Sequence, residues 1–204
     1  MKVFITGTDT NIGKTIVSSW ICLHTGAEYF KPIQSGLEEE TDSEIVARLA
    51  GVKVHAECYR LRAPLSPHLS ARLDGVAIDM NRLVLPSSAN GTGNLVVEGA
   101  GGLMVPINER EFMIDVIGHF ELPVILVARS SLGTINHTLL SLKALRDRNI
   151  KILGVIMSGE PNDENKKAIE TYGAVRVIAQ IPRLECLTTE SLCRVPFSLH
   201  TKAF

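Results

Sequence analysis

The chain has 204 residues, of which 45% are hydrophobic and 21% are charged, as is typical of one compact soluble domain covering residues 1–204. Its net charge of −1 excludes nucleic acid as the main partner, and its lack of a run of ~18 apolar residues excludes a membrane span. We expect no secretory signal, because the N-terminus leads straight into a strand. The four cysteines form no Cys-x-x-Cys pair, so we expect free thiols in the cytoplasm.

Segments that predict strands and helices alternate along the chain. In order, we expect a strand at 3–5, a helix at 14–24, a strand at 28–33, a helix from 42 to a C-cap at 51, a less regular stretch at 52–93, a strand at 95–97, a helix at 112–120, a strand at 123–127, a helix at 132–148, a strand at 150–157, a helix at 161–172 and a strand at 175–178. Continuously apolar strands favour an α/β fold, a doubly wound and mostly parallel sheet with helices on both faces. Ligands bind such sheets at the carboxyl ends of the strands.

A phosphate-binding loop directly follows the first strand. Residues 7–15 read Gly-Thr-Asp-Thr-Asn-Ile-Gly-Lys-Thr. Backbone N–H groups of such a loop and the positive end of the following helix hold phosphate, while Lys14 reaches the outer phosphates and the Thr15 hydroxyl can bind magnesium. The common spelling of this P-loop would place glycine at position 8, which is Thr8 here. The motif therefore predicts a nucleotide-binding protein from a branch of the P-loop proteins whose motif differs from the common one.

The second strand leads into Lys31, within the sequence Lys-Pro-Ile-Gln-Ser-Gly. A lysine that ends an apolar run is costly unless an anion or the solvent receives it. An exposed strand-end lysine is the simpler interpretation. The neighbouring phosphate loop favours a second cation that binds phosphate or substrate.

Three oxygen-bearing side chains are candidates for one magnesium site. Glu98 ends an apolar run and precedes three glycines in four residues, which indicates a metal ligand with backbone close to a substrate, or else a tight turn with an incidental acid. Asp42 stands at a helix start, where it is either an N-cap or a magnesium ligand. With Thr15, these residues can offer hard oxygen ligands and leave room for phosphate and water.

A second helix start follows the strand at 123–127. The sequence Leu-Gly-Thr-Ile-Asn-His at 132–137 opens a helix whose free N–H groups can hold a carboxylate. Asn136 and His137 can equally be capping or interface residues.

Together, these motifs resemble the dethiobiotin synthetase family over about residues 2–184. The landmarks are the phosphate loop, Lys-Pro-Ile-Gln-Ser-Gly, Ser-Pro-His, Val-Glu-Gly-Ala-Gly-Gly and Leu-Gly-Thr-Ile-Asn-His, in the family's order. The resemblance implies a cytoplasmic ligase of biotin biosynthesis that uses ATP and Mg²⁺. It carboxylates 7,8-diaminononanoate with carbon dioxide, forms a carbamic-phosphoric anhydride and closes the ring to dethiobiotin, releasing ADP and phosphate.

The resemblance also implies a role for each matching residue. The catalytic set would be Lys14, Lys31, Thr10 and Ser35, and the magnesium ligands would be Thr15, Asp42 and Glu98, with Glu44 as a substitute for Asp42. The nucleotide would meet Asn11, Ile12, Gly13, Lys14, Thr15, Ile16, Ser158, Pro182, Arg183 and Leu184. The diamine would meet Ser35, Gly101 and Gly102, and its carboxylate would be held by Gly133, Thr134 and Asn136 of a second subunit, which makes the enzyme a homodimer with active sites at its interface.

The chain departs from the family at two positions. Asn11 stands where some relatives have glutamate. Ser158 and Gly159 stand where a base-reading asparagine is expected, although Asn162 is close in sequence.

Three other functions remain as alternatives. A partitioning or septum-placement ATPase would carry an earlier lysine in the phosphate loop, and positions 8–10 contain none. An amidoligase of the cobyrinate type would need a glutamine-hydrolysing domain, for which the chain is short. A non-catalytic nucleotide-binding protein would keep Lys14 and Thr15 without needing Lys31, Ser35 and Glu98 together.

Overall fold

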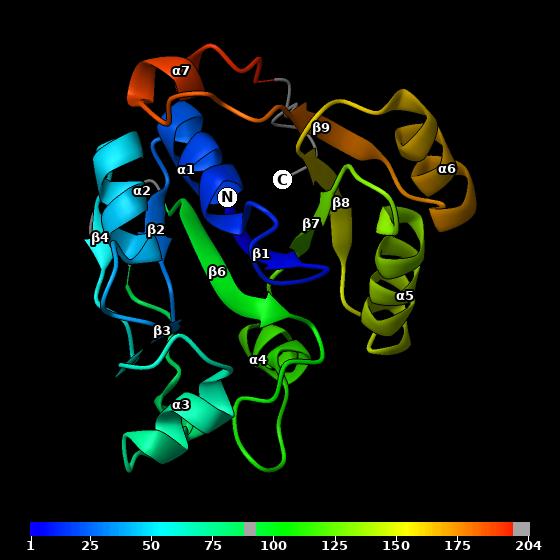
Figure 1. The fold of residues 1–204 in the computed structure, drawn as a ribbon. Helices are drawn as coiled ribbons and strands as arrows, with labels where there is room; N and C mark the ends of the chain where they lie inside the picture. The colour runs from blue at the N-terminus through cyan, green and yellow to red at the C-terminus, as the bar shows by residue number, and fades with distance from the viewer. Residues whose placement is uncertain (88–92, 198–204) are drawn as a thin grey trace.

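The computed structural model describes residues 1–87 and 93–197, and its main feature is a parallel sheet (Figure 1). Seven strands lie in the order β4 (Val54–His55), β2 (Glu28–Phe30), β6 (Leu95–Gly102), β1 (Lys2–Gly7), β7 (Val124–Arg129), β8 (Ile152–Ser158) and β9 (Val177–Ile181). Each neighbouring pair is parallel. The predicted α/β fold is confirmed.

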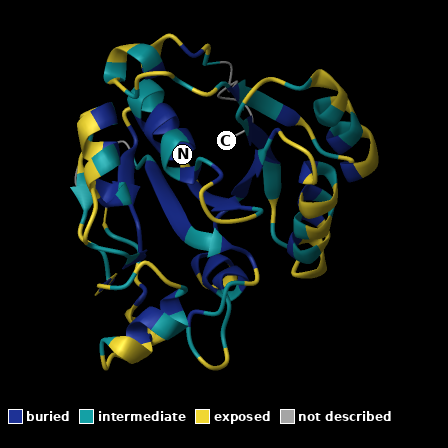
Figure 2. Cartoon of the chain, in the orientation of Figure 1, coloured by how far each residue is buried: buried dark blue, intermediate teal, exposed yellow. Residues whose placement is uncertain are grey.

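Helices cover both faces of this sheet, as predicted. On one face lie α1 (Lys14–Thr25), α2 (Asp42–Ala50) and the short α7 (Thr189–Cys193); on the other lie α4 (Met113–Phe120), α5 (Thr134–Asp147) and α6 (Asp163–Gly173). Successive residues of a strand point to opposite faces. In β1, Val3 and Ile5 pack with α1, whereas Phe4 packs with α4. Figure 2 shows the central strands largely buried, whereas the edge strands β4 and β9 are partly exposed. Burial on both faces explains why the central strands read as mainly apolar runs.

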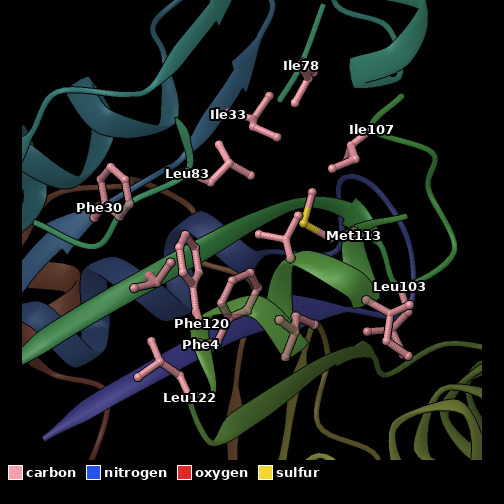
Figure 3. Close-up of a cluster of buried hydrophobic side chains, with 14 of the residues drawn as sticks. Phe4, Phe30, Ile33, Ile78, Leu83, Leu103, Ile107, Met113, Phe120 and Leu122 are labelled. Carbon is pink, nitrogen blue, oxygen red and sulfur yellow. The ribbon is translucent and has the colours of Figure 1, made fainter. Parts of the chain in front are cut away.

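An aromatic cluster fixes α4 beneath β1 and β2 (Figure 3). The ring centroids of Phe4 and Phe120 are 6.3 Å apart, and those of Phe30 and Phe120 are 6.5 Å apart. These rings anchor the strand that leads into the phosphate loop and the strand that leads into Lys31. The core therefore supports the carboxyl ends of both strands.

The predicted strand at 28–33 is wrong, because the chain forms two separate strands there. After β2, residues Lys31 and Pro32 leave the main sheet, and β3 (Ile33–Ser35) pairs with β5 (Tyr59–Leu61) in a second sheet of two strands. Proline has no N–H to give to a central ladder, so the main sheet loses this strand at Pro32. The break leaves Lys31 at the carboxyl edge.

The less regular stretch at 52–93 contains more structure than its sequence pattern indicates. Besides β4 and β5 it holds α3 (Pro67–Leu73) and the 3₁₀ turn η1 (Met80–Arg82). Proline suits the first turn of a helix, where an N–H has no partner, and α3 starts at Pro67. Its last part, residues 88–92, lies outside the described residues. Within the described ranges, no helix is long and apolar enough to cross a membrane.

Candidate active site

The phosphate loop joins β1 to α1 through two backbone conformations of the left-handed type. Gly13, the N-cap of α1, has φ of 94°, and Asn11 has φ of 56°. A Cβ atom at Gly13 would collide with the Ser158 hydroxyl, and one at Gly7 would lie 2.5 Å from Ile12 Cδ1. The tight contact at Gly7 gives a physical reason for glycine at this position.

Lys14 lies inside this loop. Its side chain is buried, and Nζ donates a hydrogen bond to the Asp9 carbonyl at 2.9 Å. Burial and, next, the positive charge of Lys31 lower the pKa of Lys14 to about 8. Two cations are thus held near each other, an arrangement that an anionic ligand would stabilise.

Lys31, Asp42, Glu98 and Thr15 form the polar cluster beside the loop. Lys31 Nζ lies 2.8 Å from Asp42 Oδ2 and 3.1 Å from Glu98 Oε1. The Thr15 hydroxyl bonds the Asp42 carboxylate and lies 3.0 Å from Glu98 Oε1. The structure therefore brings the three residues that the sequence proposed as one magnesium site, from α1, α2 and β6, together with Lys31, which directly follows β2.

The simpler interpretation of Lys31 is wrong, because only 3% of this residue is exposed. Burial alone would lower the pKa of Lys31, but the negative charges of Glu98 and Asp42 outweigh burial and raise it. The same pairing outweighs the burial of Asp42 and lowers the pKa of its carboxyl group. Lys31 is held as a cation.

Glu98 lies within β6 rather than after a strand that ends at residue 97, so the tight-turn interpretation is also wrong. The strand continues to Gly102, which pairs with Gly7. A Cβ at Gly99 would lie 2.9 Å from a ring carbon of Phe4. Glycine lets β6 continue this far against β1 and the loop.

Asp42 is not the N-cap of α2. Thr41 holds that position, and its side chain forms a capping box with Glu44. The spacing Ser/Thr-x-x-Glu is a sequence signature of such a box, and it could have placed the helix start at Thr41. Asp42 is therefore free to face Lys31, whereas Glu44 is exposed and accepts a hydrogen bond from Thr41 N at 2.8 Å.

The donor set fits magnesium better than a metal held by protein ligands alone. No group of three or more His, Cys, Asp or Glu side chains that could hold a metal occurs in residues 1–87 and 93–197. Magnesium usually takes one or two carboxylates together with substrate phosphates and water. Two carboxylates and one hydroxyl beside a phosphate loop match that preference.

Ser35 ends β3, whereas Thr10 of the phosphate loop and Gly101 of β6 lie close to each other. The Ser35 hydroxyl is buried and has no hydrogen-bond partner within the described chain. The Thr10 N–H donates to Asp9 Oδ1 at 2.7 Å. A Cβ at Gly101 would lie 3.5 Å from Thr10 Oγ1, so the end of β6, including Gly102, runs beside the loop. The unpaired Ser35 hydroxyl is an available donor for a ligand.

The start of α5 is ordered by its own chain. Gly133 is the left-handed N-cap, and the buried Thr134 donates its hydroxyl to the Arg129 carbonyl at 2.5 Å. Asn136 is exposed. Among the described residues, no hydrogen bond or ion pair links Gly133, Thr134 or Asn136 to the Lys31 cluster of the same chain.

The other predicted nucleotide contacts surround the loop. Ser158 ends β8 against Gly13, and residues 182–184 follow the end of β9. Of the loop residues, Ile12 packs its side chain in the core with Ile16 against it, and Asn11 is exposed. Asn162 caps α6, and its Oδ1 accepts a hydrogen bond from Asn165 N at 2.9 Å.

Sequence reasoning missed three residues that bond to the site. Ser18 and Tyr29 both donate to Glu98 Oε2, and Arg129 pairs with Asp9 of the loop. Ser18 lies one helical turn after Thr15, and Tyr29 of β2 lies two residues before Lys31. These spacings, three along a helix and two along a strand, could have pointed to Ser18 and Tyr29.

Fold, loop and cluster together define a P-loop protein of the nucleoside-triphosphate-binding class. The model of the family described as AAA domain matches residues 1–191. Among solved structures, a ParA family ATPase from Chlorobium tepidum has a TM-score of 0.55 at 13% identity, covering 94% of this chain and 87% of that one. The septum site-determining protein MinD with Mg-ADP from Pyrococcus horikoshii has a TM-score of 0.52 at 13% identity, covering 96% and 94%. At this identity the likeness shows the fold alone.

Curated relatives are far more similar in sequence. The ATP-dependent dethiobiotin synthetase BioD of Lawsonia intracellularis is 50% identical over 202 residues, 99% of this chain and 98% of that protein. The protein of the same name from Paramagnetospirillum magneticum is 51% identical over 95% of this chain and 94% of its own length. The biotin biosynthesis bifunctional protein BioCD of Bordetella avium is 53% identical over 93% of this chain, which spans 41% of that protein. The chain belongs to the ATP-dependent dethiobiotin synthetase family.

Proposed function

We propose that this chain is a cytoplasmic dethiobiotin synthase of one domain, which uses ATP and carbon dioxide to convert 7,8-diaminononanoate to dethiobiotin. Membership of the family supports the reaction. The observation that carries it at the level of residues is the buried Lys31, a second cation between Glu98 and Asp42 beside the phosphate loop. A protein that only binds a nucleotide needs no such cation.

The reaction asks the protein mainly to position groups and neutralise charge. One substrate amine forms a carbamate with carbon dioxide, and a carbamate oxygen attacks the γ-phosphorus while ADP leaves. The second amine then attacks the carbonyl carbon of the anhydride, and phosphate leaves as the ring closes. Each step needs aligned reactants and fixed positive charge around the transferring phosphoryl group.

The residues divide these tasks. Lys14 and the backbone of residues 11–16 hold the phosphates, and Lys31 faces the carbamate and the phosphoryl group in transfer. Thr10 and the unpaired Ser35 hydroxyl donate hydrogen bonds to the carbamate or phosphate. Gly101 and Gly102 admit the diamine, and residues 182–184 with Ser158 flank the base.

Magnesium would be held by Thr15, Asp42 and Glu98, where it would neutralise phosphate charge when bound. We expect Asp42→Asn to raise the Mg²⁺ concentration for half-maximal activity about tenfold or more, because it removes one of two anionic ligands. The matched control is Glu44→Gln, which affects only the exposed capping box. A magnesium titration in which Glu44→Gln shows the larger shift would assign the ligand to Glu44 instead.

The homodimer would form through the α5 face. Leu132 is 99% exposed and Leu140 60% exposed, and Leu140 lines a hollow of about 300 Å³ with Thr8, Asp9, His137 and Ser141. A second subunit there would bring its own Gly133, Thr134 and Asn136 to the substrate carboxylate. Exposed apolar side chains beside a phosphate loop are typical of a covered interface.

We expect Leu140→Asp to convert the dimer to monomer, because a buried unpaired carboxylate opposes association. Sedimentation measures the oligomeric state, and activity should fall with the dimer fraction. The control is Tyr172→Asp, which changes another exposed apolar residue, on α6. A Leu140→Asp protein that stays dimeric would exclude this face.

The function is tested with purified protein, ATP, Mg²⁺ and bicarbonate, with and without 7,8-diaminononanoate. We expect ADP release that depends on the diamine and equals the dethiobiotin found by mass spectrometry. The absence of both, with ATP and with other nucleoside triphosphates, would overturn the assignment.

A further inference from the structure

The two carboxylate oxygens of Glu98 have different partners. Oε2 accepts hydrogen bonds from Ser18 Oγ at 2.7 Å and from the Tyr29 hydroxyl at 3.0 Å. Oε1 lies 3.0 Å from Thr15 Oγ1 and 3.1 Å from Lys31 Nζ. Only Oε1 therefore shares its partners with Asp42.

The partners of Oε2 are rigidly placed. Ser18 and Tyr29 are completely buried, and Glu98 is 1% exposed. Burial and the nearby Glu98 charge raise the pKa of Tyr29 well above its usual value, so its hydroxyl remains a donor. Ser18 comes from α1 and Tyr29 from β2, so two elements clamp the same oxygen.

The occupied oxygen restricts how Glu98 can bind a cation. A carboxylate oxygen has two lone pairs, and both on Oε2 are directed to donors that bond only Glu98, whereas the two donors of Oε1 are shared with Asp42 and belong to the cation site itself. Mg²⁺ takes carboxylates through single oxygens in an octahedral shell, whereas Ca²⁺ accepts six to eight ligands and often both oxygens of one carboxylate. The two hydrogen bonds to Oε2 are compatible with binding of Mg²⁺ through Oε1 alone. They oppose binding of Ca²⁺ through both oxygens.

We propose that Ser18 and Tyr29 are positioning residues that hold Glu98 as a single-oxygen ligand and thereby make the site prefer Mg²⁺ to Ca²⁺. This inference rests on the magnesium site of the proposed function. A purely structural role, in which both donors only satisfy a buried carboxylate, would lower stability without changing the preference between the two ions.

The test measures ion binding directly, without turnover. Mn²⁺ bound to the protein with a non-hydrolysable ATP analogue is followed by electron paramagnetic resonance, and Mg²⁺ or Ca²⁺ displaces it. In the Ser18→Ala, Tyr29→Phe double variant we expect the Kd for Mg²⁺ to rise about tenfold or more, as for other residues that orient metal ligands. The Kd for Ca²⁺ should rise less, so the Mg²⁺ preference falls.

Two buried residues outside the site serve as matched controls. The Tyr59 hydroxyl accepts a hydrogen bond from Asp79 N at 2.9 Å, and the Ser70 hydroxyl donates to the Ala63 carbonyl at 2.9 Å. Tyr59→Phe and Ser70→Ala should lower the unfolding temperature without changing the ratio of the two dissociation constants. If the double variant does not fold, Ser18→Ala alone is measured and should shift the ratio in the same direction.

If the folded variant keeps the wild-type ratio of the Kd values for Ca²⁺ and Mg²⁺, the inference is overturned. Equal weakening of the binding of both ions gives this result. Failure of this inference can be distinguished from failure of the proposed function. Wild-type protein that forms dethiobiotin while the variant keeps its Mg²⁺ preference refutes the clamp alone. Wild-type protein that forms no dethiobiotin while the variant loses the preference refutes the proposed reaction alone.

Discussion

Replacing Lys31 with glutamine is expected to lower turnover about a hundredfold or more, because in the proposed function it removes the preorganised charge that faces the transferring phosphoryl group. Lys31 is buried between Asp42 and Glu98, so its charge is fixed at this position by both carboxylates. If the ammonium acts mainly in the transition state, kcat falls while the KM for ATP changes little. Single-turnover measurement of ADP formation checks this expectation.

The same substitution leaves two carboxylates without their shared cation. Breaking a buried ion pair costs about 3–5 kcal/mol of stability, so the unfolding temperature of Lys31→Gln must be measured beside its activity. Excess Mg²⁺ should restore part of the stability by binding Asp42 and Glu98, but it should not restore turnover. Recovery of turnover with Mg²⁺ would show that Lys31 supports the fold rather than the chemistry.

Lys14→Gln is expected to lower kcat/KM for ATP about a hundredfold or more, because the charge that contacts the outer phosphates is lost. Unlike Lys31→Gln, this change should raise the KM for ATP as well as lower kcat, since the proposed function has Lys14 bind the phosphates before and during transfer. Steady-state kinetics over a range of ATP concentrations separates the two variants.

The control for the loss of a lysine charge is Lys167→Gln, on the exposed surface of α6. It should leave both constants unchanged. The hydrogen bond from Lys14 Nζ to the Asp9 carbonyl stays within the loop, so its loss should reduce stability only slightly. Near-normal kinetics of Lys14→Gln would remove this lysine from the phosphate site.

Local patterns predicted every strand of the main sheet except β4, because the central strands are buried on both faces and so read as mainly apolar runs. They failed where short segments are ordered by distant partners. The strand β5, Tyr59–Leu61, is ordered by pairing with β3, which lies outside the main sheet because the chain leaves that sheet at Pro32. The 52–93 stretch therefore looked irregular, although its described part holds two strands and a helix.

For the site, the sequence identified residues by type and position within motifs, but their partners come from separate elements. Thr41 and Glu44 illustrate what the sequence alone leaves undecided. Their capping signature is visible in the sequence, but only the structure shows that Thr41 caps α2 and that Asp42 pairs with Lys31. The bonds from Ser18 and Tyr29 to Glu98 join residues 80 and 69 positions apart.

The sequence by itself determined the phosphate loop, the parallel α/β fold and the family. The reason is that loop conformation and strand burial each require particular residue types at neighbouring positions, so both can be recognised in short stretches of sequence. The tertiary structure decided that Lys31 is a buried cation, that Asp42 rather than Glu44 faces it, and that one oxygen of Glu98 is clamped. Those properties depend on distance, burial and charge between segments far apart in the chain. Spacing along the sequence can point to single residues such as Ser18 and Tyr29, but it does not give their contacts with Glu98.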